Sequence, residues 1–209
     1  MNITDVASET IQGDKLKAIF NRQKELMNKY HDIELRSGLL QTEDCPVNLN
    51  DKKGQARIKD FSWRVTEELG EALDAWFEGD MIHTKEELAD GLHFLTELSI
   101  LAGFDFNGWN FNGDGLEAIW EYPMYSESTM EQAVTVFISK LGMTCNCLKN
   151  KPWKQSQMLT DIPEFNNRLF ETWVSYINIM SLMFDSPDEI VDIYFKKSNV
   201  NKFRQRSGY

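Results

Sequence analysis

Residues 55–103 read QARIKDFSWRVTEELGEALDAWFEGDMIHTKEELADGLHFLTELSILAG, and this stretch decides the fold. Its apolar residues recur three, four or seven positions apart, which is the spacing of one helical face. Gly79 stands where a glycine ends a helix. The next helix begins at Thr84, whose side chain is expected to cap it while Glu87 closes a capping box. The stretch therefore predicts two helices, 55–78 and 84–103, which a short connection makes antiparallel neighbours.

The rest of the chain extends this helical pattern in both directions. Residues 1–13 are expected to be a poorly ordered lead-in, and a helix starts at Asp14. Further helices are predicted from Ser128 to Cys145, from Pro163 to Phe184 and from Ser186 onward. Residues 104–127 are expected to be irregular, since their strand-like alternation over 105–112 is too short to build a sheet. We predict one all-α domain, 1–209, built as a bundle of about six helices.

Composition limits the classes of partner. The net charge of −11 argues against a nucleic acid polymer, which requires a basic face. No apolar run is long enough to span a membrane, and the first residues lack the features of a secretory signal. The three cysteines form no CxxC pair, which fits a reducing cytoplasm.

Acidic pairs on the two central helices are the candidate catalytic feature. Glu68 and Glu71 leave one face of the first helix, and Glu87 and Asp90 repeat that spacing on the second. Four carboxylates that converge repel one another unless a cation neutralises them. Oxygen ligands without His or Cys favour Mg²⁺ or Mn²⁺ over Zn²⁺. The alternative interpretation is an ordinary solvated helix face, with Glu87 serving only the helix cap.

The spacing ExxE, then 15 residues, then ExxD resembles the signature of the MazG-like all-α nucleoside triphosphate pyrophosphatases. Residues 87–94, ELADGLHF, are similar to the form found in the dimeric dUTPase branch of that superfamily. The resemblance implies a homodimer in which the four carboxylates hold Mg²⁺ that bridges a triphosphate and activates water. Among these carboxylates we assign the role of general base to Glu68.

The last 16 residues, YFKKSNVNKFRQRSGY, carry the more specific resemblance. They are similar to the Y-x-x-K-N-x-x-N-x-x-R-Q-x-x-G-Y ending of dimeric dUTPases and phage dCTP/dUTP pyrophosphatases, except that Ser198 replaces the usual Asn. This ending implies that Lys197, Asn201 and Arg204 contact the phosphates or the sugar, and that Tyr209 is a further substrate-binding residue. Arginine and lysine suit a triphosphate, because one offers a bidentate fork and the other a point charge. The alternative is a basic, solvated tail.

The residue expected to bind the pyrimidine base lies on the first helix. Gln23 and Leu26 match the family's Q-x-x-L, whose glutamine is associated with the pyrimidine, although Met27 stands where asparagine is expected. Trp63 either walls the base pocket or packs in the core, and its place on an apolar helix favours the core.

The activity implied is hydrolysis of dUTP to dUMP and pyrophosphate in the cytoplasm. dCTP or dual dCTP/dUTP hydrolysis ranks second, and another MazG-like pyrophosphohydrolase remains an alternative. A catalytically silent helical binding module is the non-enzyme alternative. Residues 110–121 also match the spacing of an EF-hand calcium loop, but the first ligand position is Asn110, and we interpret them as an irregular surface loop.

Overall fold

The computed structural model describes residues 2–106, 111, 113–122 and 129–206. Within these residues it contains helices and no strand, so the predicted all-α fold is confirmed. The elements are η1 (Ile3–Asp5), α1 (Lys15–Ser37), α2 (Lys52–Glu78), α3 (Met81–Leu101), α4 (Gly115–Trp120), α5 (Met130–Asn146), α6 (Ile162–Ser181) and α7 (Pro187–Arg206). None of the described helices is long and apolar enough to cross a membrane.

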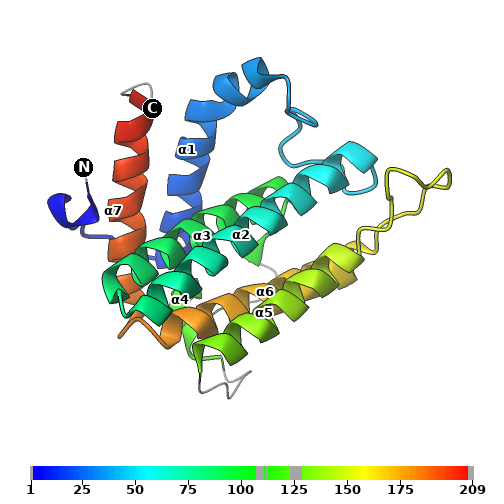
Figure 1. The fold of residues 1–209 in the computed structure, drawn as a ribbon. Helices are drawn as coiled ribbons and strands as arrows, with labels where there is room; N and C mark the ends of the chain where they lie inside the picture. The colour runs from blue at the N-terminus through cyan, green and yellow to red at the C-terminus, as the bar shows by residue number, and fades with distance from the viewer. Residues whose placement is uncertain (1, 107–110, 112, 123–128, 207–209) are drawn as a thin grey trace.

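Two antiparallel helix pairs and one flanking pair make up the fold (Figure 1). α2 and α3 pack along their length as predicted, and α5 and α6 form a second pair beside them. α1 and α7 lie next to each other and both contact α3. The core lies between these layers, where Leu88, Leu92 and Trp173 are completely buried. α3 is therefore the central helix, and it contacts residues from both ends of the chain.

The start of α3 differs from the prediction. Asp80 caps the helix by accepting a hydrogen bond from the backbone N–H of His83, and Gly79 takes a left-handed conformation with φ 80°. Thr84 lies inside the helix, where its hydroxyl donates to the Asp80 carbonyl. The predicted capping box between Thr84 and Glu87 is therefore wrong, because the tight turn allows α3 to begin one turn earlier. The helix-capping explanation for Glu87 is removed with it.

The segments expected to be irregular contain additional structure. α4 lies within 104–127, and its N-cap Asp114 also accepts a hydrogen bond from the backbone of Lys15. Asn110 of the EF-hand spacing and Ser128 of the predicted helix start lie outside the described residues, and Thr129 caps α5. In the lead-in, Ile3 is buried, and Glu9 pairs with Arg22 at 2.8 Å.

A close approach between α3 and α6 fixes the position of α3. The hydroxyl of Tyr176, a completely buried residue, donates to the carbonyl of Leu88 at 2.7 Å. A Cβ atom added to Gly91 would overlap that hydroxyl and would lie 3.5 Å from the Cβ of Glu68. Gly91 therefore allows three helices to approach one another beside the acidic pairs.

Candidate active site

Three of the four predicted carboxylates meet between α2 and α3. Oxygen atoms of Glu68, Glu71 and Glu87 all lie within 4.8 Å of one another. The helical spacing explains this, since residues three apart on α2 share a face and that face lies against α3. Glu87 is buried, and Nε2 of His83, one turn earlier on α3, lies 2.8 Å from its carboxylate. An all-oxygen set of this kind suits Mg²⁺ or Mn²⁺.

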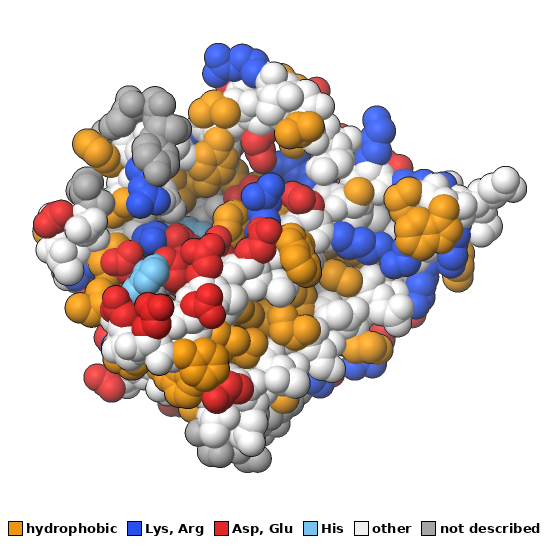
Figure 2. Space-filling model, viewed as in Figure 1, with side chains coloured by type: hydrophobic (Ala, Val, Ile, Leu, Met, Phe, Trp, Pro, Cys, Tyr) orange, Lys and Arg blue, Asp and Glu red, His pale blue; other side chains and the backbone are white. Residues whose placement is uncertain are grey.

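The fourth carboxylate, Asp90, is paired with a basic residue of the C-terminal helix. Nζ of Lys197 lies 2.9 Å from the Asp90 carboxylate and 3.4 Å from that of Glu86. Lys197 is only 4% exposed, so this pairing is shielded from water. The structure therefore brings Asp90 and Lys197 together beside the three-carboxylate cluster. In Figure 2 acidic side chains gather around a histidine on this face, with basic side chains at their border.

The electrostatics of the cluster indicate a shortage of positive charge. Burial raises the pKa of Glu68 to about 8, and the neighbouring Asp90, Glu87 and Glu71 add to the shift. Burial also raises the pKa of Asp90 to about 6, although Lys197 opposes that rise. Burial alone would lower the pKa of Lys197, but Asp90, Glu87 and Glu86 together raise it. A divalent cation would relieve the repulsion that these shifts express.

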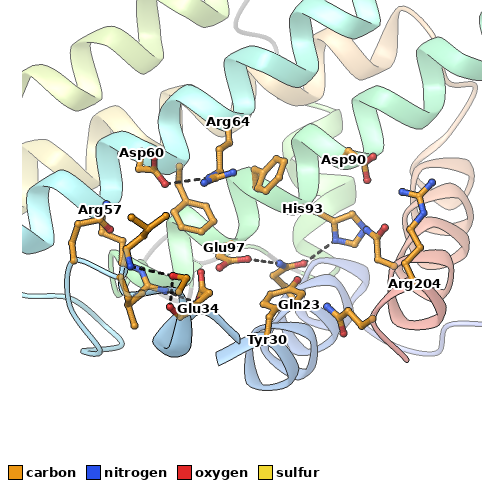
Figure 3. A pocket seen from close by; sticks show the side chains of 18 residues that line it. Gln23, Tyr30, Glu34, Arg57, Asp60, Arg64, Asp90, His93, Glu97 and Arg204 are labelled. Carbon is orange, nitrogen blue, oxygen red and sulfur yellow. Dashed lines mark hydrogen bonds and ion pairs between the residues drawn. The ribbon is translucent and has the colours of Figure 1, made fainter. Parts of the chain in front are cut away.

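A cavity of about 730 Å³ begins at Asp90 and extends between α1, α2, α3 and α7 (Figure 3). Asn201 and Arg204 of α7, which the resemblance assigns to the phosphate or sugar, both line it, and Arg204 lies on the Asp90 side of the cavity. Gln23 lines it farther along, so one cavity joins these three predicted residues. Tyr209 lies outside the described residues.

Gln23 is held by three buried partners. Its Nε2 donates to Glu97 at 2.8 Å, and its Oε1 lies 2.8 Å from Nδ1 of His93 and accepts from the Tyr194 hydroxyl at 3.1 Å. Burial lowers the pKa of His93 to about 3, so its ring is neutral at pH 7. Because an amide oxygen only accepts hydrogen bonds, Nδ1 carries the ring proton. The amide of Gln23 is thereby fixed in one orientation.

Trp63 does not belong to the core or to this cavity. Its side chain is 63% exposed, and its indole N–H donates to Glu67 at 2.9 Å. The core interpretation is wrong because the buried stripe of α2 runs through Phe61 and Val65, and residue 63 points away from both.

Three site residues were not found by sequence reasoning, namely His83, His93 and Glu97. His83 lies four positions before Glu87, a spacing that places the two side chains on one helical face. His93 and Glu97 lie three and seven positions after Asp90, which also keeps them on the face of that residue. Helical spacing from Glu87 and Asp90 could therefore have identified all three of these residues.

An all-α fold with an acidic cluster beside a cavity lined by basic and polar groups defines a class, the helical nucleoside triphosphate pyrophosphohydrolases. A family model described as dUTPase matches residues 15–209, and the chain belongs to that family. It is therefore an enzyme of the dUTP/dCTP diphosphatase type that acts on a deoxynucleoside triphosphate, and the silent binding module does not hold. No curated protein and no solved structure matches the chain.

Proposed function

We propose that this enzyme hydrolyses dUTP to dUMP and pyrophosphate with the help of Mg²⁺. The observation that carries the proposal is the gathering of Glu68, Glu71 and Glu87 within 4.8 Å, next to the cavity that contains Gln23. These carboxylates, with Asp90 adjoining, would hold the cation. When bound, Mg²⁺ supplies Lewis-acid polarisation of the phosphate oxygens and activation of water.

The chain's own residues account for the other requirements of the reaction. Arg204 and Asn201 line the same cavity as Asp90, and Lys197 contacts Asp90 directly, so Arg204, Asn201 and Lys197 would bind the phosphates. Glu68 would accept a proton from the attacking water, since it is a carboxylate in the cluster that would hold the cation. His83 would hold Glu87 in place through their 2.8 Å contact.

The decisive measurement is kcat/KM for dUTP, dCTP, dTTP and dATP with and without Mg²⁺, with the products identified. We expect dUTP to lead, pyrophosphate to be released, and activity to require the cation. Glu71→Gln should lower turnover by orders of magnitude while circular dichroism shows intact helices. Glu78→Gln, an exposed carboxylate at the end of the same helix, is the matched control and should retain activity. Preference for dATP, release of single phosphates, or full activity of Glu71→Gln would refute the proposal.

We further propose that the enzyme is a homodimer. Trp63, Phe77 and Ile82 on α2 and α3 are each at least 60% exposed, and exposed apolar side chains of this size support a contact with another chain. Sedimentation should show a dimer at micromolar concentration. A fully active monomer would refute this part of the proposal.

A further inference from the structure

Glu97 is a buried carboxylate that has no direct cationic partner among the described residues. It is 3% exposed and lines the cavity in which Gln23 lies. The two nearby arginines are engaged elsewhere, since Arg57 pairs with Glu34 and Arg64 with Asp60, each at 3.2 Å. A buried carboxylate is costly unless its oxygens are satisfied. Within the described part of the chain, its hydrogen bond comes from Gln23 alone.

The position of Glu97 relative to Asp90 suits contact with a base. The two residues lie seven positions apart on α3, which corresponds to two turns and about 10 Å along the helix axis. Both line the same cavity, with His93 between them (Figure 3). A nucleotide whose phosphates lie at Asp90 would therefore extend its base toward Glu97.

The hydrogen-bonding groups around Glu97 have a fixed direction. Gln23 must turn its amide N–H groups toward Glu97, because His93 and Tyr194 occupy its oxygen. One Glu97 oxygen accepts from that amide, and the other remains for a donor in the cavity. The second N–H of the Gln23 amide donates to the oxygen of Tyr30, whose own O–H is a donor at the cavity. The cavity thus presents a carboxylate acceptor, Glu97, beside a hydroxyl donor, Tyr30.

We propose that Glu97 determines base specificity by accepting the N3–H of uracil, while the hydroxyl of Tyr30 donates to an adjacent carbonyl oxygen of the base. The inference rests on the proposed dUTP hydrolysis and names the group that reads the base. Burial raises the pKa of Glu97 to about 7, Glu34 adds to the rise, and Gln23, Arg57 and Arg64 oppose it. A bound N–H donor favours the ionised carboxylate that the contact needs.

The substitution Glu97→Gln tests this role with little change of shape. Its amide oxygen must face the N–H of Gln23, so its NH₂ group would face the cavity and oppose the N3–H of uracil. Cytosine carries an acceptor at N3, which that NH₂ group can satisfy. We expect kcat/KM for dUTP to fall by about 10- to 100-fold and the ratio of dCTP to dUTP hydrolysis to rise. Glu25→Gln, an exposed carboxylate on α1 outside the cavity, should keep the wild-type ratio.

N3-methyl-dUTP provides the second arm, because it lacks the donor that Glu97 would bind. The wild type should prefer dUTP over this analogue by about 10- to 100-fold, and Glu97→Gln should lose most of that preference. Glu97→Met replaces Glu97→Gln if the latter does not fold by circular dichroism. A wild type that hydrolyses both substrates equally, or a variant that keeps the full preference, overturns the role of Glu97 alone. A wild type inactive on dUTP overturns both this role and the proposed function.

Discussion

The packing of Gly91 against Tyr176 leads to a quantitative prediction for Gly91→Ala. In an ordinary helix interior this substitution stabilises a protein by about 0.5–1 kcal/mol. Here the new Cβ would overlap the hydroxyl of a completely buried tyrosine. Displacing that ring adds about 1–3 kcal/mol of overpacking, and the hydroxyl that loses Leu88 costs about 1–3 kcal/mol more. We expect a net loss of about 2–4 kcal/mol.

Tyr176→Phe separates the clash from other effects of alanine. It removes the hydroxyl and its hydrogen bond, which costs about 1 kcal/mol by itself. In that background the closest contact of the Cβ introduced at position 91 is the ring carbon Cζ, at 3.2 Å, a contact that a small shift relieves. Gly91→Ala should then cost about 1 kcal/mol or less. The double-mutant cycle should therefore give a coupling energy of about 2 kcal/mol.

Urea denaturation followed by circular dichroism gives the unfolding free energy of each of the four proteins in the cycle. In a chain of this length each kcal/mol moves the melting temperature by about 2–4 °C, so Gly91→Ala should melt about 4–16 °C lower than the wild type. Additive effects of the two substitutions would show that the ring does not limit the approach of α3 to α6. Because Gly91 follows Asp90 directly, a displaced α3 should also lower turnover.

Three further predictions concern charge. Burial lowers the pKa of His93 to about 3, so the neutral ring contributes stability above pH 6.5 that is lost as the pH falls toward 3. The difference in unfolding free energy between the wild type and His93→Asn should therefore narrow from pH 7 to pH 4.5. A constant difference would contradict this prediction. Mg²⁺ should raise the melting temperature of the wild type more than that of Glu87→Gln, and equal shifts would indicate nonspecific ion effects. Lys197→Met should bind Mg²⁺ more tightly than the wild type in calorimetric titration, because it removes a competitor for Asp90. It should also turn over more slowly, because it removes a proposed phosphate contact. The substitution of the exposed Lys53 by Met is the control, and an unchanged affinity of Lys197→Met for Mg²⁺ would contradict the competition.

The helical spacing of the sequence was sufficient to predict the fold class and the central pair of helices. Apolar residues on α2 keep a regular stripe, and such a pattern determines which face of that helix is buried, whereas α3 is buried on most of its faces. The start of α3 was less predictable, because Asp80 and Thr84 both offer a capping oxygen one turn apart. The exposure of Trp63 could have been predicted from the apolar stripe of α2, since residue 63 lies off the line through Phe61 and Val65.

Helical spacing alone predicted the candidate site only where its residues are close in sequence. Three carboxylates meet because their spacing places them on facing sides of adjacent helices. The pairing of Lys197 with Asp90 joins residues more than 100 positions apart, and no local pattern indicates it. The contact between Gln23 and Glu97 likewise depends on how α1 packs against α3. These two contacts follow from long-range packing of the helices, which helical periodicity does not predict.

The acidic pairs and the C-terminal ending, which carry the family resemblance, are joined by ion pairs in the folded chain. A lysine as buried as Lys197 needs carboxylate partners, and Asp90 and Glu86 supply them. Glu68, Glu71 and Glu87 have no lysine or arginine partner among the described residues, so this side of the site lacks positive charge. The α7 side supplies the basic side chains of the site, Lys197 and Arg204. A triphosphate that carries a divalent cation fits this polarity, because its cation meets the carboxylates while its phosphate oxygens meet the basic side chains.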